Sequence, residues 1–346
     1  MRKMMIVILL LFSMSISASA SAIVAPEIPD DVQQLLPDEQ NDLAYGLWSL
    51  VRKAVLLTQP QVASVLKLCL SFVGCILFFA LISNFYNSSH TLVTLAGVLA
   101  VSAIFLSGSN PLVELATETI WKISEYGKLL LPVMTAALAA QGGTIGAAAI
   151  YGATALFDTV LSSIVSAVLI PAIYIYIVLA ILNAATADEI LKKLKDLVKW
   201  VMTWFMKIIL YIFTGYITVS GIISGTADQT AIKAAKLTIS GMIPVVGGIL
   251  SDASEAVLVG AGVVKNSVGI YGLLALIAIT IVPFLTIGLY YLFLKITASL
   301  CAVFAPKPVS NLIEDFSGAL GLLLGMTGAV CLIQLISVAS FLKGMA

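Results

Sequence analysis

Residues 159–183 read TVLSSIVSAVLIPAIYIYIVLAILN, a run of 25 residues without a charged side chain. A helix needs about 20 predominantly apolar residues to cross the hydrocarbon core of a bilayer. The rest of the chain shares this character, because 60% of its 346 residues are hydrophobic and 10% are charged. A soluble domain carries roughly 25% charged residues. The sequence therefore predicts an all-α fold, a polytopic transmembrane helix bundle.

Other apolar runs bring the expected number of spans to about six; with residues 158–183 they are 62–83, 91–107, 204–224, 268–294 and 317–342. Residues 111–128 differ, because charged side chains fall on one helical face and apolar side chains on the other. The charged face holds Glu114, Glu118, Lys122 and Glu125, and the apolar face holds Val113, Ala116, Ile120 and Ile123. We expect residues 62–128 to form a two-span hairpin followed by an interfacial helix.

The first 22 residues have the pattern of a secretory signal peptide. Arg2 and Lys3 precede an apolar stretch, and the small residues at 17–22 offer cleavage sites. An uncleaved first helix is the alternative interpretation. Residues 23–61 begin with acidic residues and prolines, and leucines recur at helical spacing after Asp38. We expect an extracytoplasmic segment with an amphipathic helix that lies on the membrane or against a partner.

Two apolar segments, 129–154 and 226–266, are interrupted by proline and glycine. The positive-inside rule places the basic stretch Lys192, Lys193, Lys195 and Lys199 in the cytoplasm. With residue 25 outside, the segment 129–154 must then enter and leave the membrane on one side. Both segments are therefore predicted to be re-entrant hairpins. The irregular backbone of such a hairpin is tolerated at membrane depth where protein or water surrounds it. The alternative is that 129–154 spans the membrane and the basic stretch lies outside.

The two interrupted segments also suggest a tandem repeat. Pro132 precedes Pro171 by 39 residues, and Pro244 precedes Pro283 by the same interval. A shift of 112 residues aligns both pairs and places Leu-Pro-Val-Met at 131–134 on Ile-Pro-Val-Val at 243–246. The predicted units are residues 129–225 and 226–346. Chance coincidence of the two proline pairs is the other interpretation.

Motifs of hydrolases, metalloproteases and phosphate-binding loops are missing from the sequence, so we predict no catalytic, cofactor-binding or metal-ligating residues. Zero net charge argues against nucleic acid as a partner. Asp158 and Lys207 lie near the ends of apolar runs and are expected to face the bundle interior or to snorkel. The candidate path-lining or partner-binding residues are those of the interrupted segments: Pro132, Gly142, Gly143, Pro244, Gly247, Gly248, Asp252, Lys265 and Asn266.

One stretch carries a family resemblance. Residues 240–256, Ser-Gly-Met-Ile-Pro-Val-Val-Gly-Gly-Ile-Leu-Ser-Asp-Ala-Ser-Glu-Ala, and the following Val-Lys-Asn-Ser-Val-Gly-Ile-Tyr-Gly at 264–272 resemble the stage III sporulation protein AE family. The resemblance implies a multi-pass protein of the mother-cell-derived outer forespore membrane. It implies as partners a secretion-type ATPase and ring-forming proteins of the same complex. It supplies no catalytic residues.

Two functional hypotheses follow. The first, implied by the resemblance, is a non-enzymatic subunit of a channel or secretion apparatus that links mother cell and forespore and sustains forespore development. The second is a stand-alone secondary transporter with its site between the two repeats, since paired interrupted segments are typical of transport sites.

Overall fold

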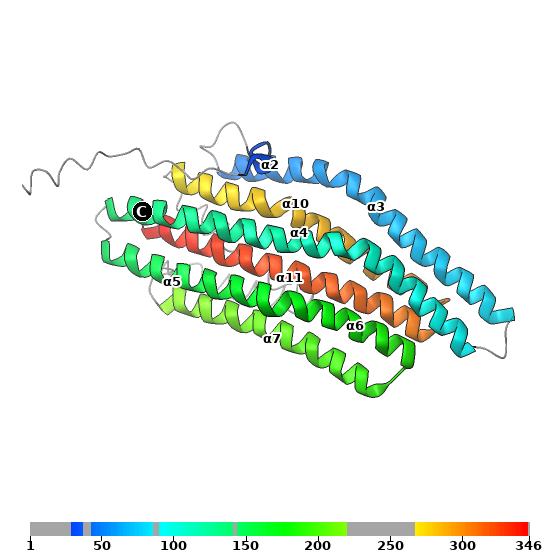
Figure 1. Cartoon of the computed structure of the whole chain (residues 1–346). Helices are drawn as coiled ribbons and strands as arrows, with labels where there is room; N and C mark the ends of the chain where they lie inside the picture. Colours follow the sequence, from blue (N-terminus) through cyan, green and yellow to red (C-terminus); the bar gives the residue numbers. More distant parts are fainter. Residues whose placement is uncertain (1–28, 37–42, 86–89, 141–143, 220–266, 345–346) are drawn as a thin grey trace, which may run out of the picture.

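The computed structural model describes residues 29–36, 43–85, 90–140, 144–219 and 267–344, which form a bundle of long helices (Figure 1). Six helices are long and apolar enough to cross a membrane, and the described residues contain no strand. The predicted all-α polytopic bundle is therefore confirmed. The elements are α2 (Asp30–Gln33), α3 (Leu43–Phe85), α4 (His90–Ala140), α5 (Thr144–Ile164), the π-helical turn η1 (Val165–Leu169), α6 (Ile170–Thr186), α7 (Glu189–Val219), α10 (Ser267–Cys301) and α11 (Lys307–Gly344).

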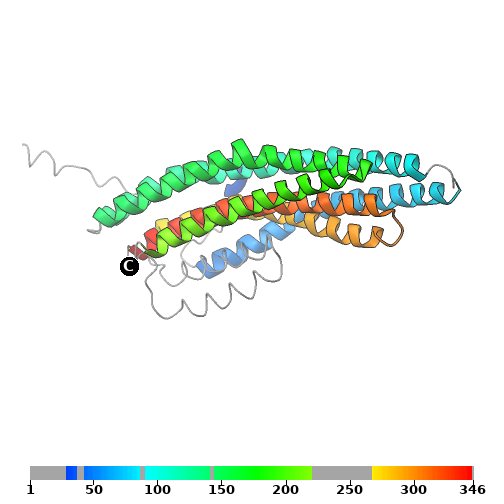
Figure 2. The ribbon, with the colours of Figure 1, turned by 90° about the horizontal axis from the view of Figure 1, so that it is seen from below.

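The long helices run back and forth between the same two ends of the bundle (Figures 1 and 2). One end, which we call the basic end, holds the α6–α7 connection and the start of α11. The other, which we call the opposite end, holds the C-terminal ends of α4 and α7 and the N-terminal ends of α5 and α10. Lys295 and Lys307 lie at the same end as the basic stretch 192–199.

Helix α11 is the centre of the bundle. In its most apolar window 94% of the residues are buried, and it contacts α4, α5, α6, α7 and α10. Its small residues permit close approach, since a Cβ at Gly321 would lie 3.0 Å from the ring of Tyr291 on α10. Phe316 stacks on Phe105 of α4 with ring centroids 3.8 Å apart. The central helix thus fixes the positions of its neighbours.

Helix α4 corrects the expected interfacial helix at 111–128. These residues continue α4, a single helix of 51 residues, without a break. Their apolar face, with Val113, Ala116, Ile120 and Ile123, is buried inside the bundle. Contacts with α10 and α11 cover this face, so it does not lie on the membrane surface. The amphipathic pattern was read correctly, but its apolar face packs against protein rather than lipid.

Helix α3 merges two other elements that the sequence separated. The expected external amphipathic helix and the span 62–83 form one helix of 43 residues with Pro60 inside it. Leu50 and Ala54 are fully buried, and a Cβ at Gly46 would lie 2.9 Å from Leu274 of α10. Packing against α10 thus extends the helix across Pro60. The predicted signal peptide at 1–22 lies outside the described residues.

The interrupted segment 129–154 also differs from expectation. Helix α4 continues through Pro132 to Ala140, and α5 begins at Thr144. The chain does return to the same end of the bundle, but through a connection between two long helices instead of a separate re-entrant hairpin. A proline is tolerated inside such a helix because neighbouring groups satisfy the freed backbone carbonyl. The segment 226–266 lies outside the described residues.

The predicted repeat stays a prediction. Helices α6 and α10 run in one direction and α7 and α11 in the other (Figure 1), as units of equal orientation require. The local geometry at the two aligned prolines differs, however. Pro171 follows the wide turn η1 at the start of α6, whereas Pro283 lies inside the continuous helix α10.

Candidate functional site

The predicted path-lining residues connect to one end of the bundle. Pro132 is exposed on α4 near the opposite end. The remaining eight, Gly142, Gly143, Pro244, Gly247, Gly248, Asp252, Lys265 and Asn266, lie outside the described residues. The helix ends that flank them, α4 with α5 and α7 with α10, meet at the opposite end (Figures 1 and 2). Both interrupted segments are therefore attached to the same end.

A row of charged side chains follows one side of α4, and two of them, Glu118 and Lys122, line a cavity that α2, α3 and α10 also line. We call this row the α4 charged face, and it consists of Glu114, Glu118, Lys122, Glu125 and Lys128. The spacing of three and four residues puts them on one side of the helix. The three glutamates and Lys128 are exposed. Lys122 Nζ forms an ion pair with Glu118 Oε1 at 3.0 Å within the same helix.

The position of the α4 charged face along the bundle can be compared with that of the neighbouring helix α5. Ser124 of α4 donates a hydrogen bond to Asp158 of α5, and the two helices are antiparallel (Figure 1). Counting ten residues from this contact toward the basic end leads to Glu114 on α4 and to Val168 in η1. These two residues therefore lie at about the same depth. Val168 is 50% exposed. The same level of the bundle thus presents a carboxylate on one helix and an apolar side chain on the next.

Charged side chains at membrane depth face a bundle interior or water, because exposure to acyl chains costs several kcal/mol per charge. The charge-free part of α11 begins after Asp315 and ends before Lys343. Within this part, the ring of Phe316 stacks on that of Phe105 of α4. Further along, Gln334 lies beside Ser124 of α4, because both side chains bond to Asp158. Glu114 and Glu118 therefore lie between the two levels that bound this charge-free part.

A polar cluster is buried between α4, α5 and α11. Asp158 Oδ1 accepts hydrogen bonds from Ser124 Oγ at 3.0 Å and from Gln334 Nε2 at 2.6 Å. The Ser124 hydroxyl also bonds to the Ser162 hydroxyl. Asp158 is 1% exposed and Gln334 fully buried. Of the two options for Asp158, interior or snorkelling, the structure shows the interior one.

Close helix packing holds this cluster in place. A Cβ at Gly127 of α4 would lie 2.6 Å from the amide of Gln334, so a glycine is required for Gln334 to reach Asp158. Asp158 Oδ2 and Gln334 Oε1 have no hydrogen-bond partner among the described residues. The sequence did not single out Ser124 or Gln334, because an isolated polar residue in an apolar run carries no local signal of its partner.

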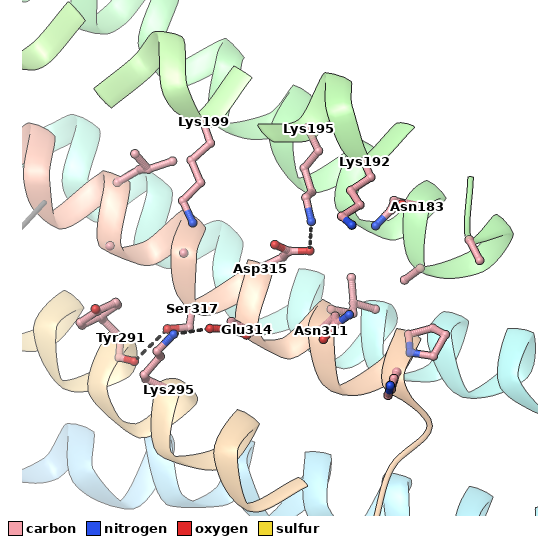
Figure 3. Close-up of a pocket in the computed structure, with 18 of the residues that line it drawn as sticks. Asn183, Lys192, Lys195, Lys199, Tyr291, Lys295, Asn311, Glu314, Asp315 and Ser317 are labelled. Carbon is pink, nitrogen blue, oxygen red and sulfur yellow. Dashed lines mark hydrogen bonds and ion pairs between the residues drawn. The ribbon is translucent and has the colours of Figure 1, made fainter. Parts of the chain in front are cut away.

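A polar cavity of about 500 Å³ opens at the basic end between α6, α7, α10 and α11 (Figure 3). Five lysines and three carboxylates line it: Lys192, Lys195, Lys199, Lys295, Lys307, Glu189, Glu314 and Asp315. Asn183, Asn311, Tyr291 and Ser317 add neutral polar groups. The basic stretch predicted from the sequence thus forms one wall of a cavity.

The turn between α6 and α7 orients α7 so that the lysines of α7 point into this cavity. Helix α6 ends where Ala187 adopts a left-handed conformation with φ of 54°, and the Ala187 amide donates to the carbonyl of Asn183 at 2.8 Å. The carboxylate of Asp188 then accepts from the Ile190 amide at 2.8 Å and caps the start of α7. Lys192, Lys195 and Lys199 consequently share the face of α7 that looks toward α11 (Figure 3).

Neither the buried cluster nor the cavity has the make-up of a metal centre. Within residues 29–36, 43–85, 90–140, 144–219 and 267–344, no three His, Cys, Asp or Glu side chains come together. The cluster can hold a hydrogen-bonded carboxyl inside the bundle, and the cavity can bind an anion. We assign no catalytic residue.

Comparison with known proteins gives the family. A sequence model of the stage III sporulation protein AE family matches residues 31–343. Stage III sporulation protein AE of Bacillus subtilis (strain 168) is 25% identical over 251 residues, which cover 72% of this chain and 63% of that protein. No solved structure matches the chain. The resemblance at residues 240–256 is thereby confirmed, and the chain belongs to the stage III sporulation protein AE family, a family of sporulation proteins.

Proposed function

We propose that this multi-pass membrane protein is a non-enzymatic subunit of a sporulation channel or secretion apparatus that links mother cell and forespore. It resides in the mother-cell-derived outer forespore membrane and works with a secretion-type ATPase and ring-forming proteins. Family membership supports the role in sporulation. The observation that carries the rest of the proposal is the α4 charged face.

This face argues for an assembly because the described part of the chain leaves its glutamates exposed. Glu114, Glu118 and Glu125 are exposed on a helix that crosses the whole bundle. A carboxylate at this depth is stable next to other protein subunits or a water-filled path. A subunit of a larger channel provides both environments, whereas a self-contained transporter encloses its charged residues among its own helices.

The interrupted segments complete the proposal. They attach to the opposite end, which faces away from the cytoplasm if the basic end obeys the positive-inside rule. Pro132 and the described helix ends that flank the other candidate residues then lie where a path leaves the membrane or a ring-forming partner docks. Those other residues are Gly142, Gly143, Pro244, Gly247, Gly248, Asp252, Lys265 and Asn266. Cysteines placed at 142 and 248 should react with aqueous thiol reagents in the assembled complex, and full protection of both would contradict a path-lining role.

Replacement of charge by leucine on α4 tests the assembly. The pair Glu114→Leu and Glu118→Leu should leave the chain folded in the membrane yet abolish its co-purification with the ATPase and ring components. Sporulation should then stop after engulfment. The control is Lys193→Leu, which removes an exposed charge on α7 at the basic end, away from the α4 charged face. Normal assembly and sporulation in the double leucine variant would overturn the proposal. Solute binding by the purified subunit alone would favour the transporter instead.

A further inference from the structure

The cavity at the basic end is a candidate binding site that the channel function does not use. It contains more positive than negative charge, because five lysines face three carboxylates. The pairing within it is incomplete. Lys195 Nζ lies 2.7 Å from Asp315 Oδ2, and Lys295 Nζ lies 2.5 Å from Glu314 Oε1. Lys192 reaches Glu189 at 3.7 Å on the exposed rim.

Lys199 and Lys307 are the unmatched cations. Among the described residues neither has a carboxylate within ion-pair distance. Lys199 is half-buried, and its Nζ lies 3.3 Å from the place of a Cβ at Gly318. The glycine thus lets the lysine lie against α11 inside the cavity. Asp315 does not neutralise it, because the two oxygens of Asp315 already accept from Tyr176 and Lys195.

The position of the cavity favours a lipid headgroup over a soluble ligand. Trp200 follows Lys199 directly, and its ring stacks with that of Trp204 at 5.9 Å. Both tryptophans are exposed on α7. Tryptophans of this kind mark the level of lipid headgroups. An ammonium group at that level, turned inward between helices, is placed to meet a phosphate that enters from the bilayer.

We propose that this cavity binds the phosphate group of an anionic phospholipid, with Lys199 as its principal cationic contact. Basic pockets between membrane helices on the cytoplasmic side are suited to such headgroups. A volume of about 500 Å³ lies in the range of small-ligand sites, about 300–1,000 Å³. Asn183 and Asn311 supply amide donors from α6 and α11 on the cavity wall (Figure 3).

The test uses the full purified chain in detergent, with cardiolipin and phosphatidylcholine as probes and native mass spectrometry as readout. The chain should retain cardiolipin and lose phosphatidylcholine. Lys199→Gln should weaken cardiolipin binding roughly five-fold, on the order expected for one charge near a membrane surface. Lys199→Arg keeps the charge and should restore binding. Lys193→Gln is the matched control, because Lys193 is an exposed residue of the same stretch that does not line the cavity.

Three results would overturn the proposal. The first is equal retention of cardiolipin and phosphatidylcholine. The second is an equal loss of cardiolipin in Lys199→Gln and Lys193→Gln, which would mean that general surface charge and not the cavity holds the lipid. The third is displacement of cardiolipin by millimolar pyrophosphate with equal binding of pyrophosphate in lipid-free protein. That result would assign the cavity to a soluble phosphate compound.

Discussion

Helices α4 and α11 lie side by side and cross the same bundle, but they differ in how far their side chains are buried. In the most apolar window of α11 94% of the residues are buried, against 33% for α4. Two buried polar side chains of α11 have partners on other helices: Asp315 pairs with Lys195 of α7, and Gln334 bonds to Asp158 of α5. On α4, Lys122 pairs with Glu118 of the same helix, and Glu114, Glu118 and Glu125 are exposed. The exposed glutamates of the α4 face are therefore available for contacts outside this chain.

The largest effect is expected at the buried ion pair of α11. Lys195→Met removes the partner of Asp315, and both side chains are nearly buried, with relative exposures of 9% and 13%. Loss of one member of a buried pair costs about 3–5 kcal/mol. Tyr176, which donates to the other oxygen of Asp315, should hold the loss near the lower value. Unfolding in mixed lipid and denaturing-detergent micelles measures it. The control, Lys295→Met, breaks a pair exposed by 48% and 59% and should cost less than about 1 kcal/mol; equal losses would contradict the account of α11.

Gln334→Leu should have the next largest effect. It removes the hydrogen bond to Asp158, and bonds to charged groups contribute about 1.5–3 kcal/mol. Replacing both partners by apolar residues of similar shape is nearly neutral, so the double variant Gln334→Leu and Asp158→Leu should recover most of the loss. A double-mutant cycle of unfolding free energies measures this coupling. Additive losses would mean that the two side chains do not act together.

The smallest effect is expected on α4. Lys122→Gln removes the pair with Glu118, and exposed pairs of this spacing contribute about 0.3–0.5 kcal/mol. The unfolding free energy of the isolated subunit should hardly change, while its co-purification with partner subunits should weaken. A loss of stability as large as that of Gln334→Leu would show that the charged face serves the fold of the single chain.

The sequence predicted the fold class, the six crossings and the amphipathic pattern of α4, because composition and helical periodicity are local signals. It did not predict that α3 and α4 are continuous. Pro60, Pro132 and the charges of 111–128 suggested breaks, but burial of apolar faces against α10 and α11 favours unbroken helices. The cavity was also missed. Its lysines were visible as a basic stretch, but Asp315 lies 120 residues from Lys195 along the chain, and no local pattern pairs them.

Spin labels at residues 114 and 168 test the environment of the α4 charged face most directly. Each single cysteine is introduced into a chain whose native Cys69, Cys75, Cys301 and Cys331 are replaced by alanine, and relaxation by oxygen and by a water-soluble nickel complex is compared in sporulating-cell membranes. The label at 168 should show the high oxygen and low nickel accessibility of a lipid-facing site. The label at 114 should show low oxygen accessibility at the same depth. Equally high oxygen accessibility at both positions would contradict the claim that the charged face of α4 meets protein or water.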